Sequence, residues 1–109
     1  MARDSGIEAL IRDDLPSIAG ITEKPMFGGW AWLLRGNLVC GARSDGMLVR
    51  LGKGKDAWAL GLPGVAPMLS RGRPMQGWVR AGPDAYGDDA LRQRLLTAAI
   101  EFVRTLPAK

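Results

Sequence analysis

The side chains that most often perform chemistry in proteins are scarce in this sequence. The chain of 109 residues has no histidine, which removes the commonest general base and metal ligand, and it has one cysteine, Cys40. Cys40 stands between Val39 and Gly41 in an apolar stretch. A catalytic thiol needs a lowered pKa and a neighbouring base, so this position favours a cysteine of the core. We therefore expect no metal site, no cofactor and no thiol catalysis.

The remaining polar patterns also lack the spacing of a reaction centre. Ser44 and Ser70 have no histidine partner, and nothing in the sequence supports a serine–lysine pair. The aspartate pairs at 13–14 and 88–89 are adjacent in predicted helices, where neighbouring side chains diverge, so we interpret them as helix-end and cap residues. The glycine–lysine repeat at 52–55 does not have the spacing of a phosphate-binding loop. The sequence therefore predicts a protein that is not an enzyme.

Positive charge is concentrated in the middle of the chain. The formal net charge is +4, and between residues 35 and 80 eight basic residues outnumber two acidic ones. This segment is the candidate anion-binding region, although a solvated strand face explains the same charge. Four tryptophans and five methionines are many for a small core, and Trp and Arg are enriched at protein interfaces. The candidate interaction surface comprises Trp30, Trp32, Arg50, Arg71, Arg73, Trp78 and Arg80.

Some residues of this region have two interpretations. Arg50 lies in a strand whose other positions are apolar, so it either reaches solvent on an open sheet face or pairs internally. Gly28 and Gly29 are typical of a bulge or a close backbone approach. Gly77 beside Trp78 indicates packing that a Cβ atom would block. For the glycines a structural role is favoured.

Apolar periodicity predicts a helix near each end of the chain. Ser5 to Glu8 fits a capping box, and apolar residues follow at helical spacing until Pro16 stops the helix. Near the other end, Asp88 or Asp89 should cap a helix that Pro107 ends. The predicted apolar stripe of this second helix consists of Leu91, Leu95, Ala98, Ala99, Phe102 and Leu106.

Between these helices the sequence predicts strands and tight turns. Residues 21–52 form a meander, with turns at Gly36-Asn37 and at Ser44-Asp45-Gly46, the second a type I′ signal. Two-residue alternation places one set of side chains on each face. Trp30, Trp32 and Leu34 share a face, and so do Leu38, Cys40 and Ala42.

A second group of strands follows a short helix over residues 55–60. A loop is expected where Pro63, Gly64 and Pro67 interrupt regular structure. Two strands at 68–70 and 75–80 should then be joined through the turn at Gly72-Arg73-Pro74.

These elements define a fold class. Tight turns make neighbouring strands antiparallel, and helices at both ends of the chain must cover the sheet. We predict an α+β, two-layer sandwich: an antiparallel sheet of about five to six strands, N- and C-terminal helices packed on it, and a short helix between the strand groups. The length fits one domain over residues 1–109. No apolar run approaches the ~18 residues of a membrane span, and acidic residues interrupt the first twenty positions. We expect no membrane association and a cytoplasmic location.

Several short motifs follow one another in order along the chain. They are Met26-Phe27-Gly28-Gly29, Arg50 within residues 48–52, the block Gly72-Arg73-Pro74-Met75-Gln76-Gly77-Trp78, and the final Thr105-Leu106-Pro107. This set resembles the N-terminal domain of the TfoX/Sxy family, regulators linked to bacterial competence, over about residues 20–107. The resemblance implies an antiparallel sheet flanked by helices. It also implies action through protein partners near a promoter, such as an activator of the cyclic-AMP receptor type.

Three functional hypotheses follow. The favoured one is a regulatory or protein-interaction domain, whose partner is a second copy of the chain or a transcription-related protein. The alternative is a basic nucleic-acid-binding domain that uses the arginine-rich sheet and exposed tryptophans, although no helix-turn-helix or recognition helix is present. The third is a small-molecule-binding domain or an unusual enzyme, for which the sequence offers no convergent polar cluster.

Overall fold

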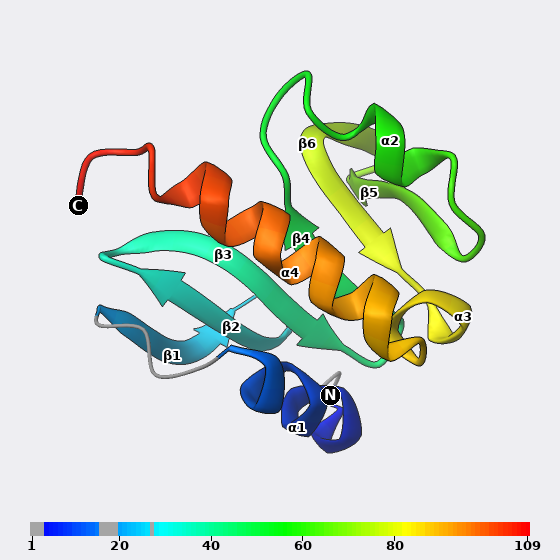
Figure 1. Cartoon of the computed structure of the whole chain (residues 1–109), viewed down its shortest axis with the longest axis horizontal. Helices are drawn as coiled ribbons and strands as arrows, with labels where there is room; N and C mark the ends of the chain where they lie inside the picture. The colour runs from blue at the N-terminus through cyan, green and yellow to red at the C-terminus, as the bar shows by residue number, and fades with distance from the viewer. Residues whose placement is uncertain (1–3, 16–19, 27) are drawn as a thin grey trace.

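An antiparallel sheet of six strands, in the order β1-β2-β3-β4-β6-β5, is the central element of the protein. The computed structural model describes residues 4–15, 20–26 and 28–109. Helices pack on one face of the sheet (Figure 1), so the predicted α+β fold class is confirmed. The elements are α1 (Ser5–Asp14), β1 (Ile21–Met26), β2 (Gly29–Leu34), β3 (Asn37–Arg43), β4 (Gly46–Arg50), α2 (Ala57–Leu60), β5 (Val65–Ser70), β6 (Arg73–Ala81), α3 (Pro83–Tyr86) and α4 (Asp89–Val103).

The predicted N-terminal cap is confirmed for α4 but not for α1. Asp88 accepts a hydrogen bond from the backbone N–H of Leu91 at 3.1 Å, as expected for the start of α4. In α1 the cap is Asp4, whose carboxylate accepts from the backbone N–H of Ile7 at 3.0 Å. The predicted capping box beginning at Ser5 is therefore wrong by one residue, because the carboxylate just before Ser5 takes that role.

The apolar stripe of α4 is rotated from its predicted position. Leu96, Ile100 and Val103 are buried against the sheet beside Leu95 and Ala99, whereas the predicted members Leu91, Ala98 and Phe102 are half-buried at the margin. The helix also ends at Val103, before the predicted stop at Pro107. Apolar residues occupy much of this helix's circumference, so the line of contact depends on how the helix lies on the sheet.

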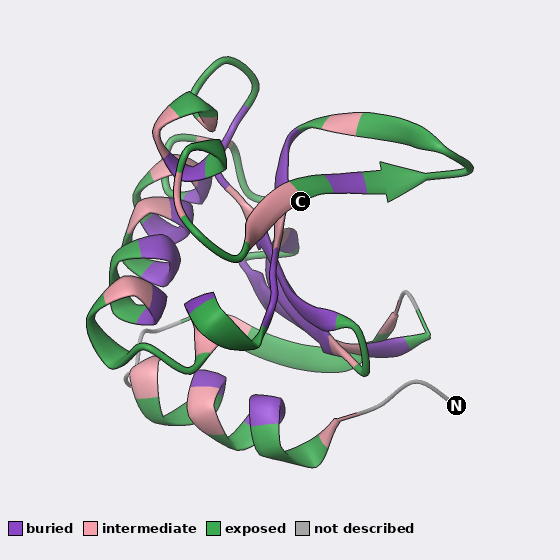
Figure 2. Ribbon diagram, turned by 90° about the vertical axis from the view of Figure 1, so that its right-hand side faces the viewer, coloured by how far each residue is buried: buried purple, intermediate pink, exposed green. Residues whose placement is uncertain are grey.

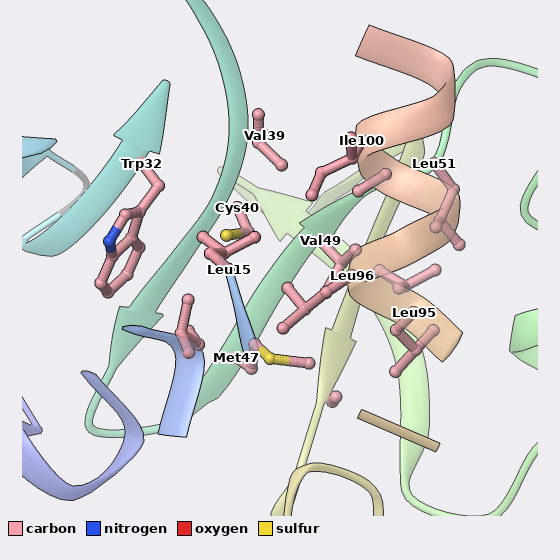
Figure 3. Packing of buried hydrophobic residues seen from close by; sticks show 14 of the residues in the cluster. Leu15, Trp32, Val39, Cys40, Met47, Val49, Leu51, Leu95, Leu96 and Ile100 are labelled. Carbon is pink, nitrogen blue, oxygen red and sulfur yellow. The ribbon is translucent and has the colours of Figure 1, made fainter. Parts of the chain in front are cut away.

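The main core lies between the helices and one face of the sheet (Figure 3). Trp32, Cys40 and Val49 point into it from three neighbouring strands and belong to the same cluster as Leu95 and other residues of α4. Burial raises the pKa of the Cys40 thiol, as expected for a cysteine of the core.

A bulge corrects the predicted faces of β3. The β2–β3 register shifts between Trp32 and Leu33, which pair with Cys40 and Leu38, so that Val39 is an extra residue. Both Val39 and Cys40 therefore reach the main core, and Leu38 lies in a second cluster on the opposite face. The prediction that Leu38 shares a face with Cys40 is wrong because two-residue alternation is interrupted there.

The turn between β3 and β4 also differs from the prediction. Positive φ falls on Gly46 (140°) and not on Ser44 or Asp45, so this turn is not type I′. Positive φ at both turn positions occurs instead at residues 35–36 and 71–72, each turn lying one residue earlier than expected.

Both edge strands contain a proline. Pro67 was expected in a loop but lies inside β5, and Pro25 lies inside β1. A proline lacks the N–H that a central strand must donate to its neighbours, but an edge strand tolerates this loss on its outer side. The prolines also remove donors that another chain would need to add a strand to either edge.

A partly buried ionic cluster joins α1 to α4. The guanidinium of Arg92 donates to Asp14 at 2.5 Å, to Asp89 at 2.9 Å and to the backbone carbonyl of Tyr86 at 2.8 Å. Burial alone would lower the pKa of Arg92, but the hydrogen bonds to the two aspartates outweigh this and raise it. Asp14 is thus a partner of α4 as well as a residue at the end of α1.

Substitution of Arg92 should destabilise the protein strongly. Arg92→Gln leaves Asp14, whose side chain is only 9% exposed, without its cation, so we expect the free energy of unfolding to fall by about 3 kcal/mol. Arg94→Gln on the same helix removes only a contact with the ring of Trp58 and should cost about 1 kcal/mol or less. Urea denaturation of both variants measures the difference, and equal losses would contradict this role of Arg92.

A second ionic cluster holds α1 against β1 and β2. Arg12 donates to Glu23 through Nε and Nη2, the shortest contact being 2.9 Å, and Trp30 Nε1 donates to the same carboxylate at 2.7 Å. The hydrogen bonds from Arg12 lower the pKa of Glu23; burial opposes this, and the bond from Trp30 adds to it.

The stabilisation from Glu23 should depend on pH. Because the folded-state pKa lies below the ordinary value of 4.5, the contribution is present above pH 4.5 and is lost as the pH falls through the lowered pKa. Glu23→Gln should therefore lower the melting temperature at neutral pH and have little effect in strong acid. Glu101→Gln, at an exposed position of α4, is the control and should show no such difference. A deficit for Glu23→Gln that is independent of pH would refute the assignment.

Candidate functional site

The face of the sheet opposite the helices carries a second apolar cluster. Leu48, Met68 and Trp78 are buried there, and Leu38 and Met75 pack against them. Among the described residues, no helix lies over this face, which we call the open face (Figure 2). Met68 and Met75 come from the β5–β6 hairpin, so the hairpin itself covers part of the open face.

The hairpin bends at Gly77. β4 pairs with β6 only from Trp78 onward, and the hairpin tip projects beyond the rest of the sheet (Figure 2). Gly77 has a φ of 84°, and its carbonyl accepts hydrogen bonds from the N–H groups of Leu51 at 2.7 Å and Gly52 at 3.1 Å. A Cβ atom at Gly77 would lie 2.6 Å from the backbone of Gly52 and Lys53. The bend therefore requires glycine, both for its φ and for the close approach of two backbones.

A groove lies between this hairpin and strands β1 to β3. Its volume is about 480 Å³, and one group of its lining residues is apolar: Met26, Leu33, Leu38, Met75 and Trp78. The charged lining residues are Lys24, Arg50 and Lys109, and Gly36 completes the set. Because every charged lining residue is basic, we call it the cationic groove.

The sequence left open whether Arg50 reaches solvent on an open sheet face or pairs internally. The residue is half-buried. Its guanidinium donates a long hydrogen bond of 3.4 Å to the carbonyl of Leu38 and lies 5.5 Å from the ring centroid of Phe102. None of the ion pairs among the described residues includes Arg50 or Lys24. Arg50 thus lines the groove with its charge not neutralised by a carboxylate.

The seven residues of the predicted interaction surface do not lie together. Trp30 and Trp32 share a face, as expected, but it is the face under the helices, where Trp32 is 1% exposed. Trp78, by contrast, lies on the open face beside Arg50, with which it pairs in the β4–β6 register. The alternation showed which residues share a face, but not which face the helices cover.

The remaining arginines of that surface occupy two places. Arg71 and Arg73 are exposed at the tip of the β5–β6 hairpin. Arg80 is half-exposed at the other end of β6, and its Nη1 donates to the carbonyl of Asp45 at 3.1 Å. Among these three, none lines the cationic groove.

The motif residues divide into structural residues and groove residues. Gly29 leaves no room for a side chain, because a Cβ atom would be 2.1 Å from the carbonyl oxygen of Ala42. Gly28, with a φ of 72°, precedes it in the turn before β2, and Phe27 lies outside the described residues. Pro74 is exposed and pairs with Leu69 near the hairpin tip.

The sequence reasoning missed several lining residues. Met26 and Arg50 belong to the motifs, but Lys24, Leu33 and Leu38 carried no signal beyond the strand pattern. Lys24 could have been found by alternation, because it lies two residues before Met26 on the same edge strand.

The lining of the cationic groove suits it to binding a ligand. Within residues 4–15, 20–26 and 28–109, no group of three or more acidic or cysteine side chains is arranged to hold a metal ion. The helices of the described chain are all too short or too polar to span a bilayer. A partly apolar groove with basic groups at its border can hold an anionic ligand without reacting with it.

These features define a class of protein: a two-layer α+β domain whose sheet is roofed on one face and presents a basic, apolar groove on the other. The family model described as the TfoX N-terminal domain matches residues 13–103, and the chain belongs to this family. The resemblance seen in the motifs is thereby confirmed. The family is non-catalytic, and at this level the domain is a regulatory one. Searches of curated proteins and of solved structures found no match.

Two glycine substitutions test the structural role of Gly77. Gly77→Ala should lower the free energy of unfolding by about 3 kcal/mol, because it combines a strained φ with a backbone clash. Gly72→Ala has a similar φ of 80° but no atom within 4 Å of the new Cβ, so about 1 kcal/mol is expected. Chemical denaturation compares the two, and a Gly77→Ala variant as stable as Gly72→Ala would contradict the close approach.

Proposed function

We propose that the protein is a non-enzymatic regulatory module that binds a protein partner through its open face. The observation that carries the proposal is the cationic groove beside a partly exposed apolar cluster. Apolar residues with a few fixed polar groups are the usual composition of a binding surface. Membership of the TfoX N-terminal domain family supports a regulatory role. The resemblance to that family also leads us to expect a partner connected with transcription.

The positions of Trp30, Trp32 and Trp78 favour a protein partner over a nucleic acid. Base stacking needs exposed aromatic faces next to basic residues. Trp32 is buried under α1, Trp30 gives its indole N–H to Glu23, and Trp78 is 8% exposed. The tip of the hairpin consists of residues 70–74. It carries the exposed arginines but contains no tryptophan.

A photo-crosslinking experiment tests the proposal. The crosslinker replaces Met75 on the open face in one variant and Gln93, exposed on α4, in the control. We expect one defined protein to be captured from Met75 in cells and not from Gln93, and its capture to be lost in the Leu38→Asp variant. Leu38 is only partly buried, so this change should leave the fold intact, which circular dichroism checks.

A parallel measurement addresses nucleic acid. Fluorescence anisotropy with random DNA at about 50 mM salt should show no binding that weakens steeply as salt is added. Salt-dependent DNA binding without a protein crosslink from Met75 would overturn the proposal in favour of nucleic acid.

A further inference from the structure

The cationic groove has a more specific chemistry than a general docking surface. Resting on the proposed function, we infer that it binds an acidic peptide segment of the partner that carries large apolar side chains. Lys24 and Arg50 lie at the groove without a carboxylate partner among the described residues, and no acidic residue lines it. Asp and Glu side chains of a partner supply the missing negative charge.

The apolar floor of the groove determines which apolar side chains the peptide carries. Leu33, Leu38 and Met75 line it, and Trp78 presents its remaining exposed surface there. The volume of about 480 Å³ lies in the range of pockets that hold a ligand or a few side chains. Methionine and leucine surfaces adapt to different apolar side chains, so the groove accepts anchors such as Leu, Phe or Met.

A second copy of the chain is a poor occupant. In a two-fold dimer through this face, the basic groove of one copy would face the same basic surface of the other, and like charges at an interface oppose association. Peptide addition to a sheet edge is also disfavoured, because Pro25 and Pro67 interrupt the two edge strands. Recognition therefore takes place through side chains in the groove.

Selection from random peptides tests the inference. A library of short displayed peptides is panned on the full chain, and sequences that also bind the Leu38→Asp variant are removed. We expect the recovered peptides to combine Asp or Glu with Leu, Phe, Trp or Met. Synthetic versions should bind about tenfold more weakly to Arg50→Gln, which corresponds to about 1.4 kcal/mol, and more weakly again as salt is raised.

Two further variants test whether peptide binding depends on the groove or only on net charge. Lys24→Gln changes an exposed residue of an edge strand, so it should weaken binding without affecting stability, even if Arg50→Gln is less stable. Arg104→Gln removes an exposed arginine just after α4 and should leave the affinity unchanged. An equal loss in Lys24→Gln and Arg104→Gln would show that only net charge matters and would refute the site.

The other outcomes also decide the question. Recovered peptides that are basic, or that lack apolar anchors, overturn the inference, and so does the absence of any enrichment. If Met75 captures a protein in cells while acidic peptides fail to bind, the proposed function stands and this ligand chemistry is wrong. If single-stranded DNA binds in an Arg50-dependent way and peptides do not, the groove is a nucleic-acid site.

Discussion

A sheet has two faces, and in this protein the central strands carry apolar side chains on both, while helices cover only one. On β4, Met47 and Val49 meet the helices and Leu48 meets the hairpin on the other side. The second face is therefore closed only in part, by a hairpin that bends back at Gly77. The groove, the exposed edge of its apolar cluster and the position of Arg50 all depend on this unequal covering.

The ion pairing of the basic residues differs between the two faces of the sheet. Under and between the helices, arginines are neutralised: Arg92 by two aspartates and Arg12 by Glu23. These pairs fix α1 to α4 and to the sheet, and a buried arginine without them would be strongly unfavourable. On the open face Lys24 and Arg50 have no such partner in the described chain, and their charge remains available to a ligand. The same residue type therefore has a structural role on one side and a binding role, as we propose, on the other.

Much of the fold could be predicted from local patterns. Alternation and turn residues located the strands, and cap residues located the start of each long helix to within a residue. Three of the errors share a cause, because each concerns a contact between secondary-structure elements. Pro67 fits in a strand because β5 is at an edge, Val39 is bulged because of its register with β2, and α4 turns a different stripe to the sheet than its spacing suggested.

By itself the sequence determined the fold class, the antiparallel pairing of strands joined by tight turns and, away from the bulge at Val39, which strand side chains share a face, because a periodicity of two residues is a property of the local backbone. It also placed Arg50 in an apolar strand and indicated that a Cβ atom at Gly77 would interfere with packing. Only the tertiary structure decided which face the helices cover and brought Lys24, Arg50 and Met75 to one groove. Those facts depend on packing between strands far apart in the chain, where no local periodicity operates.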